Sequence, residues 1–173
     1  MQKVRMILGL VVLVGVLAGC SKSDPTPALV AVTFKNLSAD PPSGGYNPAN
    51  GQPIGVTNKY TLFSFATGAT VANSDSASTK WDIGFNGTKI IINSGTSGPG
   101  SAAALVVTGI FSELNLAPDA GYLTDNSATA TYAITRGSGK GWYNYDPSTN
   151  LISPIAGRII MVKTSGGKYA KME

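Results

Sequence analysis

The sequence contains no histidine and only one cysteine, Cys20. The missing histidines exclude catalytic triads built on histidine, and with a single cysteine they also exclude zinc sites of histidine and cysteine. One cysteine cannot form an intramolecular disulfide, so packing and hydrogen bonds alone must hold the fold. The nine carboxylates are scattered, and no two stand at a spacing that would place both on one strand face for acid–base chemistry. The sequence therefore does not predict an enzyme.

Charged residues are scarce as well, at 13% of the chain. The 13 basic residues exceed the 9 acidic ones, but Lys3 and Arg5 belong to an N-terminal leader and the remainder is close to neutral. This balance gives no reason to expect a nucleic-acid partner. Glycine, serine, threonine and asparagine are abundant, and this mixture favours an all-β domain with polar loops over a helical one.

The first twenty residues have the three parts of a secretory signal. Lys3 and Arg5 carry positive charge, residues 6–18 are uncharged and almost wholly apolar, and small residues precede Cys20. The apolar segment is too short for a membrane-spanning helix. Residues 17–20, Leu-Ala-Gly-Cys, resemble the bacterial lipobox, which implies diacylation of the Cys20 thiol and cleavage before it. The alternative is an ordinary signal peptide or N-terminal anchor with a coincidental cysteine.

This leader divides the chain into three expected parts: a signal peptide over residues 1–19, a lipidated tether over residues 20–28, and one β-domain over residues 29–173. The tether has two prolines and no apolar period. More than one acyl chain would hold the protein stably at a membrane. Ser21 differs from the aspartate that signals retention in the inner membrane, so we expect a lipid-anchored outer-membrane protein, on either the periplasmic or the cell-surface face.

Period-two patterns predict a succession of strands. Trp81, Ile83 and Phe85 alternate with polar or small residues, which predicts a half-buried strand, and Asn86-Gly87 predicts a tight hairpin after it. The predicted strands cover residues 60–66, 80–86, 89–92, 129–135, 141–145, 158–164 and 168–172. The apolar residues 102–110 predict either a strand or a short buried segment.

Three segments are predicted to be irregular or only briefly helical. Residues 39–53, rich in proline and glycine, predict a long loop that is either functional or mobile. The glycine-rich run 93–100 predicts a second break in regular structure. Residues 111–116 predict a single helical turn before Pro118.

The second half of the chain concentrates aromatic residues. They are Tyr122, Tyr132, Trp142, Tyr143, Tyr145 and Tyr169. Aromatic side chains on a sheet are typical of core and cross-strand packing. The alternative is a flat apolar ligand pocket, in which rings stack and a phenol supplies a hydrogen bond or a metal ligand.

Several segments follow one another in a distinctive order. In chain order they are Trp-Asp-Ile-Gly-Phe-Asn (81–86), the glycine-rich run after Ile92, Phe-Ser-Glu-Leu (111–114) leading to Ala-Pro (117–118), Gly-Tyr (121–122), Trp-Tyr-Asn-Tyr (142–145) and Lys-Thr-Ser-Gly-Gly-Lys-Tyr-Ala-Lys (163–171). Together they resemble the HmuY-like family of Bacteroidetes lipoproteins. The similarity covers residues 60–173, and the last segment is the most specific.

The resemblance implies an all-β, mostly antiparallel single domain of the HmuY-like type in an outer-membrane or surface lipoprotein. It implies haem binding for iron acquisition, in which captured haem is delivered to a TonB-dependent outer-membrane receptor. It also implies further strands after Lys171, so we expect the domain to be truncated at its C-terminal end.

One feature departs from this family. Its founding member holds haem iron between two histidines, and relatives use methionine instead. This chain has no histidine, and after the leader its methionines are Met161 and Met172. Asn150 stands where many relatives have a histidine, and tyrosine ligates haem iron in some proteins. The candidate haem-binding residues are therefore Tyr122, Tyr132, Tyr143 and Met161, with none singled out as the axial ligand.

The missing histidines leave two functions open. The first is haem capture by a different set of ligands. The second is a lipoprotein of the same fold that does not bind haem and instead binds another ligand or a partner at the surface.

Overall fold

The computed structural model describes Phe34 and residues 36–173. The predicted signal peptide, the lipid attachment at Cys20 and the tether lie outside the described residues. The described residues form one all-β domain in which every strand pair is antiparallel. They include no α-helix, and no helix in this part of the chain has the length and apolar character needed to cross a membrane. The predicted fold class is confirmed.

A four-stranded sheet has the order β2-β1-β3-β4. Its strands are β1 (Thr61–Ser64), β2 (Ala69–Val71), β3 (Ile83–Asn86) and β4 (Lys89–Ile92). Asn86 pairs with Lys89, so only Gly87 and Thr88 connect β3 to β4. Gly87 has a φ of 54°, which glycine adopts without steric cost and which tight hairpins require. The predicted hairpin is confirmed.

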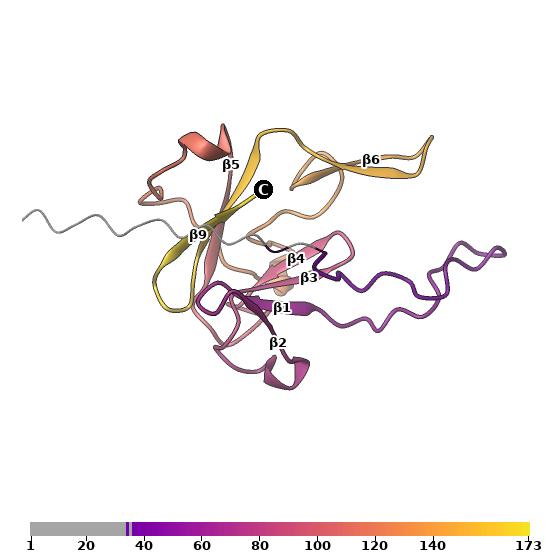
Figure 1. Ribbon diagram of the computed structural model, residues 1–173, viewed down its shortest axis with the longest axis horizontal. Helices are drawn as coiled ribbons and strands as arrows, with labels where there is room; N and C mark the ends of the chain where they lie inside the picture. The colour runs from indigo at the N-terminus through magenta and orange to yellow at the C-terminus, as the bar shows by residue number, and fades with distance from the viewer. Residues whose placement is uncertain (1–33, 35) are drawn as a thin grey trace, which may run out of the picture. The chain divides into compact units, whose positions relative to one another are not determined.

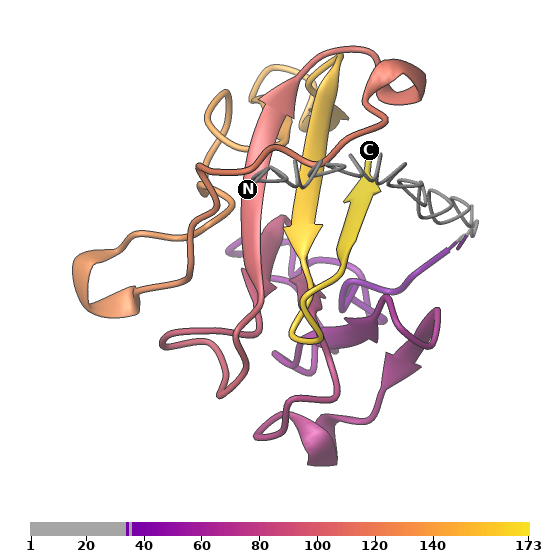
Figure 2. The same ribbon diagram turned by 90° about the vertical axis from the view of Figure 1, so that its left-hand side faces the viewer.

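The remaining strands form two further sheets. The three-stranded sheet has the order β5-β8-β9, with β5 (Ala103–Thr108), β8 (Arg158–Lys163) and β9 (Tyr169–Met172) side by side (Figure 2). The other sheet is a hairpin of β6 (Tyr143–Asp146) and β7 (Leu151–Pro154), which projects from the rest of the domain (Figure 1).

Short 3₁₀ helices connect some of the strands: η1 (Asn73–Asp75), η2 (Phe111–Glu113) and η3 (Ser127–Thr129). The helix η2 confirms the predicted helical turn. The chain after η2 crosses the outer face of the three-stranded sheet (Figure 2). It is held there because Lys171 Nζ in β9 donates to the carbonyls of Phe111 and Leu114.

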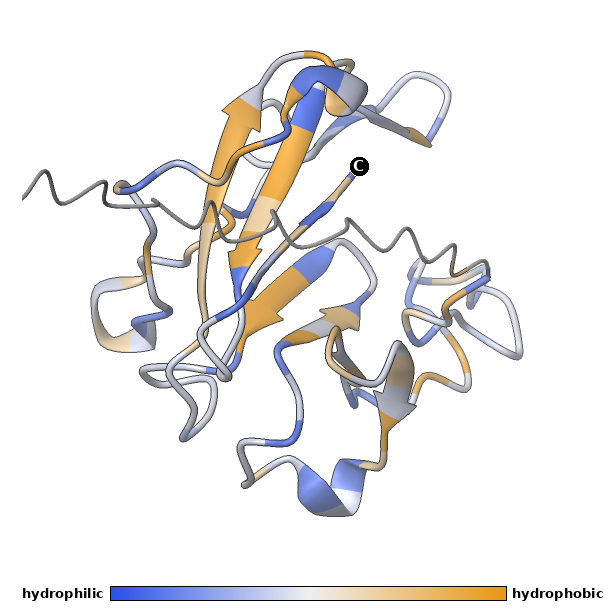
Figure 3. Cartoon of the chain, turned by 60° about the vertical axis from the view of Figure 1, so that its left-hand side comes forward, coloured by the Kyte–Doolittle hydropathy of each residue, from blue (hydrophilic) through white to orange (hydrophobic). Residues whose placement is uncertain are grey.

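One face of each larger sheet contributes to a shared hydrophobic core, and Figure 3 shows the long strands β5 and β8 as mainly hydrophobic. The buried residues that the two sheets contribute to this core are Phe63, Ile83, Ile90 and Ile92 from the four-stranded sheet, and Ala104, Ile160 and Val162 from the three-stranded sheet. Because side chains alternate along a strand, Ile91 points to the opposite face of the first sheet. There it forms a second, smaller cluster with Leu62 and Trp81.

The prediction that residues 80–86 form a half-buried strand was wrong in two respects. The strand β3 begins only at Ile83, and the polar residue just before it, Asp82, is buried at 4% exposure. Asp82 is buried because its two carboxylate oxygens accept hydrogen bonds from the backbone N–H groups of Phe65 and Ser165, both at 2.9 Å. It thereby joins the four-stranded sheet to the turn between β8 and β9.

The predicted strand at residues 129–135 was also wrong. This segment begins in η3 and has only an isolated bridge between Asn126 and Thr131. Side chains take the hydrogen bonds that a neighbouring strand would have supplied, because Asn126 Oδ1 accepts from the N–H of Ala128 and Asp125 Oδ1 accepts from the N–H of Ala133. Such local side-chain acceptors compete with strand pairing.

The predicted long loop folds back on itself as an exposed ribbon. Tyr46 bridges to Pro53, and the ribbon extends well beyond the sheets in Figure 1. Its base is held by Asp40, whose carboxylate accepts from the N–H groups of Thr57 and Asn58 at 2.8 and 2.7 Å. These backbone hydrogen bonds, led by that of Thr57, lower the pKa of Asp40 below its usual value.

Candidate functional site

Two of the four candidate haem residues lie in packed surroundings. Met161 is in the middle of β8, where it pairs with Leu105 and Lys171, and it is 3% exposed. Tyr122 lies against Tyr169, with ring centroids 5.6 Å apart, and its hydroxyl is buried without a hydrogen-bond partner. Burial, with smaller contributions from Tyr169 and Asp119, raises the pKa of the Tyr122 phenol. A raised pKa disfavours the phenolate form that binds iron.

The third candidate, Tyr143, belongs to an exposed aromatic surface on the β6–β7 hairpin. Tyr143 and Tyr145 are two residues apart in β6 and so share a face, opposite Pro154 and Ile152 of β7. We call these four residues the hairpin face. Tyr145 and Ile152, which pair across the two strands, are 43% and 50% exposed and so present adjoining apolar surface to solvent.

The base of this hairpin is fixed to the four-stranded sheet. Trp142 packs against Tyr143 with ring centroids 5.1 Å apart. The Trp142 indole N–H donates to the carbonyl of Thr88 at 3.0 Å, in the β3–β4 turn. The hairpin face is therefore exposed but held in place at one end.

The tip of the hairpin brings a phenol and a carboxamide together. The Asp146 carboxylate accepts from the Ser148 hydroxyl and N–H and from the Thr149 hydroxyl, and these bonds lower its pKa. This turn leaves Asn150 at a φ of 57°, a left-handed conformation that asparagine tolerates better than most residues. The Tyr145 hydroxyl then donates to Asn150 Oδ1 at 2.8 Å.

The fourth candidate, Tyr132, lines an open hollow of about 380 Å³ on the outer face of the four-stranded sheet. We call it the sheet hollow. Its base is the smaller apolar cluster described above, and Tyr60, Tyr132 and Arg136 stand at one side. The Arg136 guanidinium carbon lies 3.5 Å from the centre of the Tyr132 ring, a cation–π contact.

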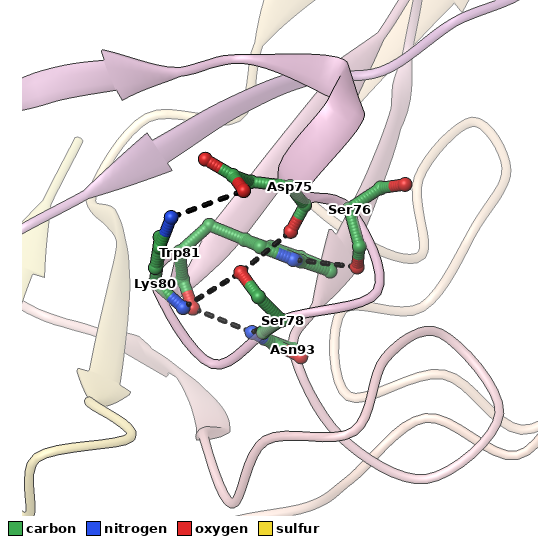
Figure 4. A network of polar contacts seen from close by, with 6 residues as sticks. All are labelled: Asp75, Ser76, Ser78, Lys80, Trp81 and Asn93. Carbon is green, nitrogen blue, oxygen red and sulfur yellow. Dashed lines mark hydrogen bonds and ion pairs between the residues drawn. The ribbon is translucent and has the colours of Figure 1, made fainter.

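The base of the sheet hollow is rigid. Trp81 is 1% exposed, and its indole N–H donates to the carbonyl of Ser76 at 2.9 Å. Asn93 Nδ2 donates to the carbonyls of Trp81 and Ser78, at 2.7 and 2.9 Å. Figure 4 shows how these contacts surround Trp81, with the ion pair of Lys80 and Asp75 beside them.

Asp125 positions the segment that carries Tyr132. It is 1% exposed, and its carboxylate accepts from the N–H of Ile92 in β4 and from the N–H of Ala133, both at 2.9 Å. Its carbonyl approaches Gly95 so closely that a Cβ there would lie 1.9 Å from the oxygen. Only glycine fits at position 95, so the glycine-rich run predicted as a break also permits this close approach.

The structure does not bring the four candidates together. Tyr143 lies on the hairpin and Tyr132 lines the sheet hollow. Met161 is part of the three-stranded sheet, and Tyr122 packs against Tyr169 of that sheet. Within the described part of the chain, no group of three or more acidic or cysteine side chains could hold a metal ion. The candidates therefore identify three different places rather than one site.

Sequence reasoning missed three residues at these places. Tyr145 is the exposed member of the aromatic pair, and the two-residue spacing from Tyr143 was a signal that both share one face. Ile152 could not be placed, because β7 shows no apolar alternation. Arg136 follows Tyr132 by four residues, but nothing in its local pattern shows that it folds back over that ring.

The described residues therefore form an antiparallel all-β domain that exposes aromatic and cationic side chains. The family model described as HmuY protein matches residues 56–173, more than half of the chain. The chain belongs to the HmuY family, which is associated with haem binding and is not known for enzymes. A comparison with curated proteins finds no match.

Proposed function

We propose that this protein is an outer-membrane lipoprotein that captures haem on its hairpin face and passes it to a TonB-dependent uptake receptor. Family membership supports haem as the ligand. The observation that carries the location is the exposure of Tyr145 and Ile152 on one face of a hairpin whose base is fixed. An open face of this kind suits a protein that must release its cargo to a partner.

The hairpin face fits the chemistry of haem. A porphyrin is flat and largely apolar, and each square ångström of apolar surface removed from water contributes about 25 cal/mol. Tyr143, Tyr145 and Ile152 offer such surface, and the phenol oxygen of Tyr145 is a possible iron donor. The Asn150 carboxamide accepts from this phenol, and after rotation its amide can donate to a phenolate.

Haem is the cargo in this proposal, and the protein's task is to bind and orient it. Without histidine, the described residues offer no bis-histidine ligation. We therefore expect haem to be held by apolar packing and one phenolate bond. Such binding is weaker than bis-histidine ligation, which agrees with a relay function.

We expect hemin to give the mature chain a Soret shift and a phenolate-to-iron charge-transfer band. The protein used is residues 20–173 with Cys20→Ser, which carries neither the apolar leader nor an acyl chain and so needs no detergent. Tyr145→Phe keeps the ring and removes only the oxygen, so it should abolish the charge-transfer band. It should also weaken hemin binding on the order of tenfold, equivalent to about 1.4 kcal/mol. Absorption titration measures both effects.

Tyr122→Phe is the matched control, because it removes a phenol oxygen that is buried away from solvent. It should leave the hemin spectrum unchanged. An unaltered charge-transfer band in Tyr145→Phe would refute the assigned ligand. A lack of any spectral change with the folded, unaltered protein would favour the alternative function, a lipoprotein of the same fold that binds a different ligand.

We also propose that Cys20 carries the membrane anchor. Cells fed a fatty acid with a clickable terminus should label the wild-type protein, and Cys20→Ala should lose the label completely, because the chain has no other thiol. In-gel fluorescence of the captured protein is the measurement. Equal labelling of wild type and variant would rule out the lipid attachment.

A further inference from the structure

We infer that the sheet hollow is a second binding site, separate from the hairpin face, for a small aromatic carboxylate. None of the four hairpin-face residues lines the hollow. The inference therefore does not rest on the proposal that haem binds the hairpin face.

The charge of the hollow indicates an anionic ligand. Lys59 and Arg136 are its charged lining residues, and no carboxylate lines it. Within the part of the chain that the structure describes, the one ion pair joins Lys80 to Asp75, so Arg136 has no acidic partner. The acidic residues nearest to Arg136 along the chain are already engaged, Asp125 with the N–H groups of Ile92 and Ala133 and Asp146 with Ser148 and Thr149.

The Arg136 guanidinium is held in place but poorly satisfied. It is fixed against the Tyr132 ring, and its Nη2 reaches the Tyr60 hydroxyl only at 3.5 Å, the limit of a hydrogen bond. Its Nε is buried and has no acceptor among the described residues. A half-buried cation without an anionic partner is unfavourable. A ligand carboxylate would supply the missing negative charge and acceptors, because it can accept two parallel N–H bonds from the Arg136 guanidinium.

The shape and lining of the hollow indicate an aromatic body on that carboxylate. Tyr60 and Tyr132 supply ring surface, and Trp81 lies at the base. A volume of about 380 Å³ lies near the lower end of the range of roughly 300–1,000 Å³ found for small-molecule sites. A ligand of one or two rings matches this volume better than a large one.

The probe for this site is 2-naphthoate, and 2-naphthamide is the neutral probe of the same shape. The chain has two tryptophans, of which Trp81 lines the hollow and Trp142 does not. In ¹H–¹⁵N spectra of residues 20–173 with Cys20→Ser, we expect 2-naphthoate to shift the Trp81 indole signal saturably. The Trp142 signal should stay in place. The amide should bind at least about tenfold more weakly, because it lacks the charge-assisted hydrogen bonds.

Arg136→Gln should reduce the affinity for 2-naphthoate to that for 2-naphthamide. Arg136→Lys keeps the charge but loses the forked geometry, so its affinity should be intermediate. Arg158→Gln is the matched control, since Arg158 also has a buried Nε without an acceptor but does not line the hollow. Its affinity should equal that of the unaltered protein.

Three results would overturn the inference. They are equal affinity for the two probes, a shift of the Trp142 signal instead of the Trp81 signal, and no saturable binding. The first comparison needs no variant, so it decides the question even if Arg136→Gln does not fold. Displacement of 2-naphthoate by hemin would show that the hollow belongs to the haem site. Loss of 2-naphthoate binding in Arg136→Gln with an unchanged hemin spectrum separates the two sites.

Discussion

Asp125→Ala is expected to lower the free energy of unfolding by about 3 kcal/mol. The substitution leaves two backbone N–H groups, those of Ile92 and Ala133, without an acceptor in the interior. Each unsatisfied buried donor costs about 1–3 kcal/mol. Burying the Asp125 carboxylate itself costs free energy, because the residue is only 1% exposed, and the substitution removes that cost. The net loss of stability therefore lies in the lower part of the range summed for the two donors. Urea unfolding followed by tryptophan fluorescence measures it.

Two variants test the reason for this loss. Asp125→Asn keeps one carbonyl oxygen as an acceptor and should lose about half as much stability. Asp119→Ala removes an exposed carboxylate and should change stability by less than about 0.5 kcal/mol. If Asp125→Ala proves as stable as Asp119→Ala, the hydrogen bonds from Ile92 and Ala133 to Asp125 do not stabilise the domain.

Asp82→Ala should cost a similar amount, about 3 kcal/mol, because Phe65 and Ser165 would each lose the acceptor of a buried or half-buried N–H. Unlike Asp125→Ala, this substitution should loosen the turn between β8 and β9, because the hydrogen bond from Ser165 to Asp82 attaches that turn to the four-stranded sheet. Hydrogen exchange should therefore accelerate at Ser165 more than at residues within β4. Denaturant unfolding and exchange of the same sample report both effects.

The matched control for Asp82 is Asp75→Ala. It removes a carboxylate in the same region whose ion pair with Lys80 is solvent-exposed, and exposed pairs contribute at most about 1 kcal/mol. Unchanged exchange at Ser165 in Asp82→Ala would show that the turn is held by other contacts.

The parts of the fold that could be predicted are those that depend on neighbours in the chain. The β3–β4 hairpin follows from Asn86-Gly87, and β8 follows from a run of apolar residues ended by a turn. β2 and β7 could not be predicted, because they are short and mostly exposed and lack an apolar period. Their pairing is decided by the strands beside them.

The buried carboxylates could not be predicted for a different reason. Asp82 stands in an alternating pattern that normally places a polar residue in solvent. The backbone N–H groups that donate to its carboxylate belong to residues 17 and 83 positions away in the chain, so no local pattern reveals them. The error at residues 129–135 has the same origin, since Asp125 takes the N–H of Ala133.

The candidate sites were predictable in chemistry but not in place. Composition showed that any haem ligand must be something other than histidine, and tyrosine and methionine were the alternatives. Which tyrosine is accessible depends on burial, and this separates Tyr122 from Tyr145. The position of Arg136 over Tyr132 depends on how the segment after Asp125 folds back, which the sequence alone does not show.

The hydrogen bond from Ser165 to Asp82 also affects the order in which the domain folds. The four-stranded sheet uses only residues 61–92, so it can form early from contacts close in the chain. β5 must wait for β8, which begins 50 residues after β5 ends, and the Ser165 bond closes a separation of 83 residues. Contacts between distant residues slow folding. The Asp82 carboxylate can therefore accept its second hydrogen bond only once the growing chain has reached Ser165.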